Sequence, residues 1–129
     1  MNVILRSKLF PLFWTGATAV TIRDMIYVRR DYWSWLPVDS QRALITHELV
    51  HVRQEGQEGA VRFFFKYIFQ RSFRFKMELE AYTAEAQFWI NQGVPKQYAV
   101  LIMARTLSSS LYRVSSYGGA LLHLWENTK

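Results

Sequence analysis

Two histidines and a glutamate stand at positions that could together build a hydrolytic metal site. The chain reads H-E-x-x-H from His47 to His51. Residues four apart lie on one face of an α-helix, so both imidazoles can bind one divalent ion. Glu48 leaves the flank of that face, where it can act as general base toward a water activated by the ion. The spacing therefore predicts a metal-dependent hydrolase.

The motif lies in a segment that favours a helix. Pro37 is followed by Asp39 and Ser40, and either of these side chains can cap the free N–H groups of a helix start. No glycine or proline occurs from Gln41 to Gln54, and Gly56 is placed to end the helix. We therefore expect one helix to carry the whole motif.

A catalytic zinc site usually has a third protein ligand and one open position for water. The chain contains no cysteine, so histidine and carboxylate are the available ligands. The strongest candidates are Glu78 and Glu80 on a later helix, where only one of the two can face the site. Glu55, in the helix of the motif, is disfavoured because three ligands on one straight helix close a tetrahedron poorly. His123, distant in sequence, stays as a further alternative.

These residues resemble the gluzincin family of zinc metallopeptidases. In that family H-E-x-x-H is followed by a glutamate ligand on a later helix, commonly as E-x-x-A, and the chain reads E-L-E-A from Glu78. The resemblance implies one Zn²⁺ held by His47, His51 and Glu78, with Glu48 as catalytic base in peptide-bond hydrolysis. It covers roughly residues 18–92, and it implies a minimal core in which an upstream edge strand lines the cleft and pairs with extended substrate.

The chain departs from known zincin patterns in ways that bear on this assignment. Tyr82 stands where many gluzincins have aspartate, so a carboxylate that would support the site is missing or supplied elsewhere. Metzincins are excluded, because positions 54 and 57 are glutamine instead of glycine and histidine. The group that would stabilise the oxyanion stays open among Tyr82, Tyr117, Arg105 and His123.

The composition favours one globular domain over residues 1–129, since half of the residues are hydrophobic. Residues 18–29 are rich in β-branched side chains and predict either a hairpin with a turn at Arg23-Asp24 or one longer strand. The next segment, 29–37, is expected to be a connection. Further helices are expected at 60–70, 77–92 and 96–106, with a last one within 111–125 interrupted by glycines. The expected fold class is α+β: a mostly helical minimal zincin core with a short N-terminal β-hairpin or edge strand packed beside the helix of the motif.

The N-terminal residues allow two interpretations. An uncharged run of 14 residues from Leu9 to Ile22 follows Arg6 and Lys8, as in a signal peptide. Pro11 interrupts the run, which is too short to span a bilayer. We favour a retained segment packed on the domain and a cytoplasmic location, with a signal peptide as the alternative.

A basic and aromatic stretch at 62–76 offers a different function. Its first part predicts a helix whose apolar face carries Val61, Phe64, Phe65 and Ile68. We favour a core-packed helix with snorkelling cations, although the net charge of +6 leaves a weak membrane-surface contact open.

The expected partner is a peptide or protein substrate, with no nucleic acid, and the sequence does not define an oligomeric state. The alternatives to a peptidase are a zincin-like module that binds without cutting and a basic-aromatic binder of membrane surfaces or nucleic acid.

Overall fold

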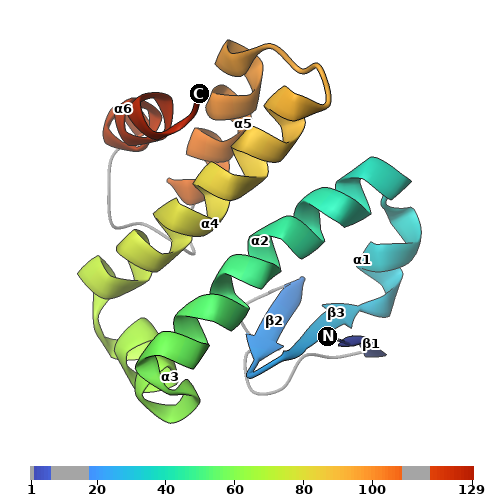
Figure 1. Cartoon of the computed structure of the whole chain (residues 1–129), viewed down its shortest axis with the longest axis vertical. Coiled ribbons are helices and arrows are strands. Elements are labelled where there is room, and N and C mark those ends of the chain that lie inside the picture. Colours follow the sequence, from blue (N-terminus) through green and yellow to red (C-terminus); the bar gives the residue numbers. More distant parts are fainter. Residues whose placement is uncertain (1, 7–17, 109–116) are drawn as a thin grey trace.

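The computed structural model of the chain describes residues 2–6, 18–108 and 117–129. The described part is mostly helical and contains a three-stranded sheet at its N-terminal side, which confirms the predicted α+β class (Figure 1). The strands are β1 (Asn2–Arg6), β2 (Ala19–Ile22) and β3 (Met25–Arg29). The helices are α1 (Arg30–Trp35), α2 (Val38–Glu58), α3 (Ala60–Phe69), α4 (Arg71–Asn91), α5 (Lys96–Leu107) and α6 (Tyr117–Asn127).

The sheet has the order β1-β3-β2, so β3 is central and β2 is an edge strand. β2 and β3 pair antiparallel across the two-residue turn at Arg23-Asp24, which selects the hairpin from the two predicted alternatives. β1 pairs parallel with β3, and the sequence pattern does not predict this strand because its partner is distant. Residues 7–17, which hold most of the run considered as a signal peptide, lie outside the described residues.

The structure corrects several predicted helix boundaries. α1 replaces the expected connection, and α4 begins at Arg71 instead of Met77. α2 passes through Gly56 and ends at Glu58, followed by Gly59 with φ 89°. Neither Asp39 nor Ser40 caps its start, because Pro37 takes the capping position without a side-chain hydrogen bond. The paired glycines at 118–119 lie in the first turn of α6 and do not interrupt it. Among the helices of the described residues, none combines the length and apolar character needed to cross a bilayer.

The prediction that α3 buries the face with Val61, Phe64 and Phe65 is wrong. These three side chains are exposed, and Phe63 is the buried residue of the helix. The sequence period identifies which residues share a face, but the tertiary contacts decide which face turns inward.

The apolar core and the polar site lie on adjacent faces of α4, and Tyr82 touches both. Toward α5 and α6, α4 contributes Tyr82 and Ala86 to a cluster of buried apolar side chains. Toward α2, it packs antiparallel, since Glu85 contacts His47 at one end and Met77 contacts Gln54 at the other. The sheet lies on the other side of α2 (Figure 1). α2 therefore runs between the sheet and α4, and its buried face can meet groups from both.

Two glycines at the end of α2 provide a matched test of this boundary. Gly56 lies within the helix, and a methyl group added there would meet open space, so Gly56→Ala should raise the free energy of unfolding by about 0.5–1 kcal/mol. Gly59 has φ 89° and ψ 132°, so Gly59→Ala should lower it by about 1–3 kcal/mol. Urea denaturation of both variants measures the two effects. Equal stability of the two variants would contradict the observed end of α2.

Candidate metal centre

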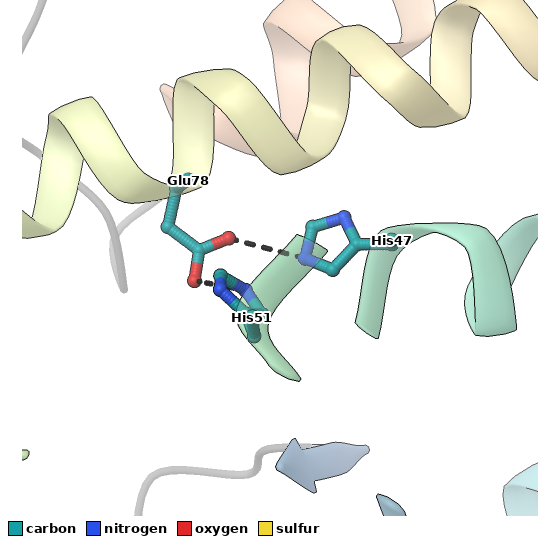
Figure 2. A group of neighbouring side chains, drawn as sticks. All are labelled: His47, His51 and Glu78. Carbon is teal, nitrogen blue, oxygen red and sulfur yellow. Dashed lines mark ion pairs between the residues drawn. The ribbon is translucent and has the colours of Figure 1, made fainter. Parts of the chain in front are cut away.

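Three buried side chains from two helices meet between α2 and α4. The Nε2 atom of His47 lies 3.2 Å from Oε2 of Glu78, and Nε2 of His51 lies 3.2 Å from Oε1 of the same carboxylate. One ligand atom from each residue lies within 4.8 Å of the other two. Figure 2 shows both imidazoles turned toward the carboxylate of Glu78. The structure thus brings together the three residues that the sequence predicts as metal ligands.

Each imidazole is oriented through its other nitrogen. Nδ1 of His47 lies 3.1 Å from Oε2 of Glu85, and Nδ1 of His51 lies 2.9 Å from Oε1 of Gln54. A carboxylate can only accept, so the contact with Glu85 places the proton of His47 on Nδ1. In the neutral imidazole, Nε2 of His47 then carries the lone pair that a metal ion can bind, and in the imidazolium Nε2 faces Glu78 as a donor.

Gln54 fixes the second imidazole in the same way. Its amide nitrogen donates to the carbonyl oxygen of Met77 at 3.1 Å and to Oε2 of Glu80 at 2.8 Å. The amide oxygen of Gln54 must therefore face His51 as an acceptor, which places the proton of His51 on Nδ1. When both imidazoles are neutral, as a metal ion would require, both Nε2 atoms are consequently acceptors that face the carboxylate of Glu78. Lone pairs that face one another in a buried site repel unless a cation lies between them.

One buried oxygen of Glu78 indicates where a metal ion could bind. Oε2 of Glu78 is buried, and its contact with Nε2 of His47 at 3.2 Å is an ion-pair contact that lacks good hydrogen-bond geometry, whereas buried oxygens without a good hydrogen bond are rare and costly. Protons on both imidazoles relieve the two contacts, and so does one divalent ion that binds all three groups at once. Two imidazole nitrogens and a carboxylate oxygen, with supporting hydrogen bonds on the distal nitrogens, suit Zn²⁺. The residues present therefore fit a metal ion.

The electrostatics of the site follow from this arrangement. Burial alone lowers the pKa of His47, but the carboxylates of Glu78 and Glu85 outweigh it, so the pKa lies well above its ordinary value. The pKa of His51 is also raised, because Glu78 outweighs the burial of its ring. Burial raises the pKa of Glu78, but the charges and hydrogen bonds of the two imidazoles hold it well below its usual range. Protons and a metal ion thus compete for the same nitrogens.

Glu48 lies beside the three candidate ligands without belonging to their group. It lines the same cavity, of about 90 Å³, together with the three candidate ligands and β2. The hydroxyl of Thr21, on β2, donates to Oε2 of Glu48 at 2.6 Å. The edge strand therefore positions the carboxylate next to the site.

Tyr67 is a residue of the site that sequence reasoning missed. Its hydroxyl donates to Oε1 of Glu78, and its ring lies against His51 at a centroid distance of 6.4 Å. Only its position on the same helical stripe as the buried Phe63 could have indicated it, because residues four apart share a face. Of the four residues considered as oxyanion donors, only Tyr82 contacts the site, where its ring packs edge-on against His47 with centroids 4.4 Å apart. The other three lie outside the cavity walls: Tyr117, Arg105 and His123.

The remaining ligand candidates lie apart from the group. Glu80 is half-exposed, pairs with Arg53 and accepts a hydrogen bond from Gln54. Glu55 lines the cavity but accepts a hydrogen bond from the backbone N–H of Arg23. His123 is exposed on α6, next to Phe75. Within residues 2–6, 18–108 and 117–129, the group of His47, His51 and Glu78 is the one whose geometry can hold a metal ion.

Comparison of the chain with protein-family models, curated proteins and solved structures gave no significant match.

The two acidic residues of α4 allow a matched test of the metal site. Glu78→Gln should lower the affinity for Zn²⁺ by about 100-fold or more, because it removes a charged ligand. Glu80→Gln should change the affinity by less than about tenfold, since Glu80 is not a ligand and the carbonyl oxygen of Met77 still holds the amide of Gln54. Competition with a chromogenic chelator at constant pH measures both affinities. A larger loss in the Glu80 variant would contradict the arrangement.

Glu55 predicts a pH dependence of stability in the metal-free protein. Burial raises the pKa of Glu55 to about 7 from 4.5, and the N–H of Arg23 offsets this only in part. A raised carboxyl pKa contributes stability that is complete below pH 4.5 and lost as the pH rises through 7. Between pH 5 and 8, the wild type should therefore lose about 1–2 kcal/mol more than Glu55→Gln.

Urea denaturation with a chelator present measures that difference at both pH values. Glu126→Gln, at an exposed position of α6, is the control and should follow the wild type. Parallel pH profiles of the wild type and the Glu55 variant would show that Glu55 does not titrate in this range.

Proposed function

We propose that the chain is a zinc-dependent peptidase that hydrolyses peptide bonds in a peptide or protein substrate. The observation that carries the proposal is the convergence of two oriented imidazoles and one carboxylate on a single buried point, with a further carboxylate, Glu48, in the same cavity. The hydrogen bonds from Glu85 and Gln54 hold both imidazoles in the orientation that a shared metal ion would need.

The ligand set favours zinc among the divalent ions. His47, His51 and Glu78 would hold Zn²⁺ with one position left for water, a set of two histidines and one glutamate found in catalytic zinc sites. Bound there, Zn²⁺ would supply Lewis acidity, polarising a substrate carbonyl and lowering the pKa of water toward ~7.

Glu48 is the residue placed to move the proton. Its carboxylate lines the cavity, and the hydroxyl of Thr21 holds one of its oxygens at 2.6 Å. The other oxygen is left to accept the proton of an attacking water and to pass it to the leaving amine nitrogen. Glu48 is 5% exposed, so this exchange would take place away from bulk solvent.

Tyr67 is better placed than the residues considered from the sequence to stabilise an oxyanion. Its hydroxyl lies in the cavity and donates to Glu78, which makes it a positioning residue for that carboxylate. Once Glu78 has an ion to bind, the same O–H can turn to a developing oxyanion on the substrate. We therefore propose Tyr67 as the oxyanion donor, ahead of the four residues considered from the sequence.

The edge strand β2 offers a place for an extended substrate. Ala19, Val20 and Thr21 line the cavity, and within the described sheet β2 pairs with β3 along one side only. An edge strand presents unpaired backbone groups to which a peptide can add as a further strand. A substrate held there would pass its backbone beside Glu48.

Two substitutions distinguish zinc binding from peptide hydrolysis. Glu48→Gln should keep stoichiometric zinc and lower the turnover of a cleaved peptide by about 10²–10⁴-fold, because the proton acceptor is gone. His47→Ala should lose zinc and turnover together. Zinc content by atomic absorption and cleavage of a fluorogenic peptide library measure the two effects.

The same experiment distinguishes a module that binds without cutting. Stoichiometric zinc in a wild-type protein that cleaves no member of the library would reject the peptidase and leave a binding module. Full turnover by Glu48→Gln would reject the role of Glu48, and wild-type zinc content in His47→Ala would reject the ligand assignment.

A further inference from the structure

The helix α3 presents a broad apolar face away from the protein. Four of its side chains are exposed by more than a third, three of them phenylalanines: Val61 at 70%, Phe64 at 38%, Phe65 at 55% and Phe69 at 75%. We name these four residues the outer face of α3. Monomeric proteins rarely leave several large apolar side chains together on one helix face, and such patches mark interaction sites.

The inner side of α3 is firmly attached. Phe63 is buried, and its ring stacks on that of Tyr67 with centroids 5.8 Å apart. Tyr67 donates to Glu78, which ties the helix to the candidate metal centre. Because these contacts fix the rotation of α3, the outer face cannot turn inward without breaking them.

The surroundings of the outer face are strongly basic. Between residues 59 and 77 the chain has five cationic side chains and no acidic one. Two of the cations, Arg62 and Lys66, share the carboxylate of Glu58. Arg71 and Lys76, in the first turns of α4, are exposed. An apolar helix face flanked by exposed cations is complementary to a surface that is apolar inside and anionic at its boundary.

We infer that the outer face of α3 docks onto the surface of an anionic lipid bilayer. The helix would lie in the plane of the interface, with the phenylalanine rings among the acyl chains and the cations at the headgroups. Its ten residues, about 15 Å long, suit this placement and are too few to span the bilayer. α3 lies at one end of the molecule, where a flat surface can reach it (Figure 1).

Two other partners fit less well. A twofold dimer through this face would bring the same five cations of each copy together, which is repulsive. A nucleic acid would need free ring faces for base stacking. Phe65 and Phe69 instead stack on each other, with centroids 6.1 Å apart and an angle of 11° between the rings. A lipid phase needs neither free ring faces nor a second copy.

Vesicle binding of the full chain tests the inference independently of any peptidase activity. Sedimentation with vesicles of phosphatidylcholine and phosphatidylglycerol at 7:3 should pull down the wild type, and pure phosphatidylcholine should bind it about tenfold less. Phe65→Gln with Phe69→Gln should lower the partition coefficient by about tenfold or more. Trp35→Gln removes an aromatic side chain that is 87% exposed on α1, and it should bind like the wild type.

The charges are tested separately. Arg71→Gln with Lys76→Gln should weaken binding about tenfold and reduce its dependence on salt. Circular dichroism should show native helicity in all variants. If the double phenylalanine variant misfolds, the single variant Phe69→Gln tests the same face and should show an intermediate loss of vesicle binding. Failure of the wild type to sediment with anionic vesicles would overturn the inference. A phenylalanine variant that binds fully would do the same. A dimer in light scattering that the phenylalanine variant abolishes, without vesicle binding, would overturn it in favour of a second copy.

Discussion

The structure depends on one electrostatic constraint: two imidazole nitrogens and a carboxylate that face one another in a buried space. Each Nε2 atom lies 3.2 Å from an oxygen of Glu78, and each Nδ1 atom is already engaged by another residue. When the imidazoles are neutral, acceptors held in this way need a shared cation, and in its absence protons take that place. The antiparallel packing of α2 on α4 brings them together, because a parallel arrangement would separate Glu85 from His47 or Met77 from Gln54. The metal proposal rests on this geometry.

The constraint explains why α2 buries so little apolar surface. Apart from Ala43, the buried residues of this helix are polar or charged: His47, Glu48, His51, Gln54 and Glu55. Burying such groups costs stability unless each finds a partner. The apolar cluster formed by α4, α5 and α6 offsets that cost on the adjacent face of α4. α4 is thus the element shared by the two, with one side that builds the core and another that supplies Glu78 and Glu85 to the site.

The part of the site that was predictable from the sequence is the part fixed by local spacing. The histidines at 47 and 51 share a helix face by periodicity alone, and the same rule separates Glu78 from Glu80. The extended character of residues 18–29 also follows from local preference, but the choice of a hairpin over one longer strand came from the structure, and the parallel pairing of β1 depends on a distant strand. The sequence could not predict the residues that orient the candidate ligands, because their contacts form only after α2, α3 and α4 have packed; they are Gln54, Glu85 and Tyr67. Nothing in the spacing distinguishes these polar side chains from solvated ones.

The polar contacts of the site explain which face of α3 turns inward, a choice that hydrophobicity alone leaves open. Apolar side chains surround most of this helix, so burial alone favours the broader stripe with Val61 and Phe65 as the inner side. The structure instead turns Phe63 and Tyr67 inward. Only that rotation brings a hydroxyl to Glu78 and a ring to His51, which satisfies a buried carboxylate that the wider stripe would leave without this donor. The apolar stripe therefore stays outside because Glu78 needs the hydroxyl of Tyr67 on the inner side. Docking on a lipid surface would bury that stripe.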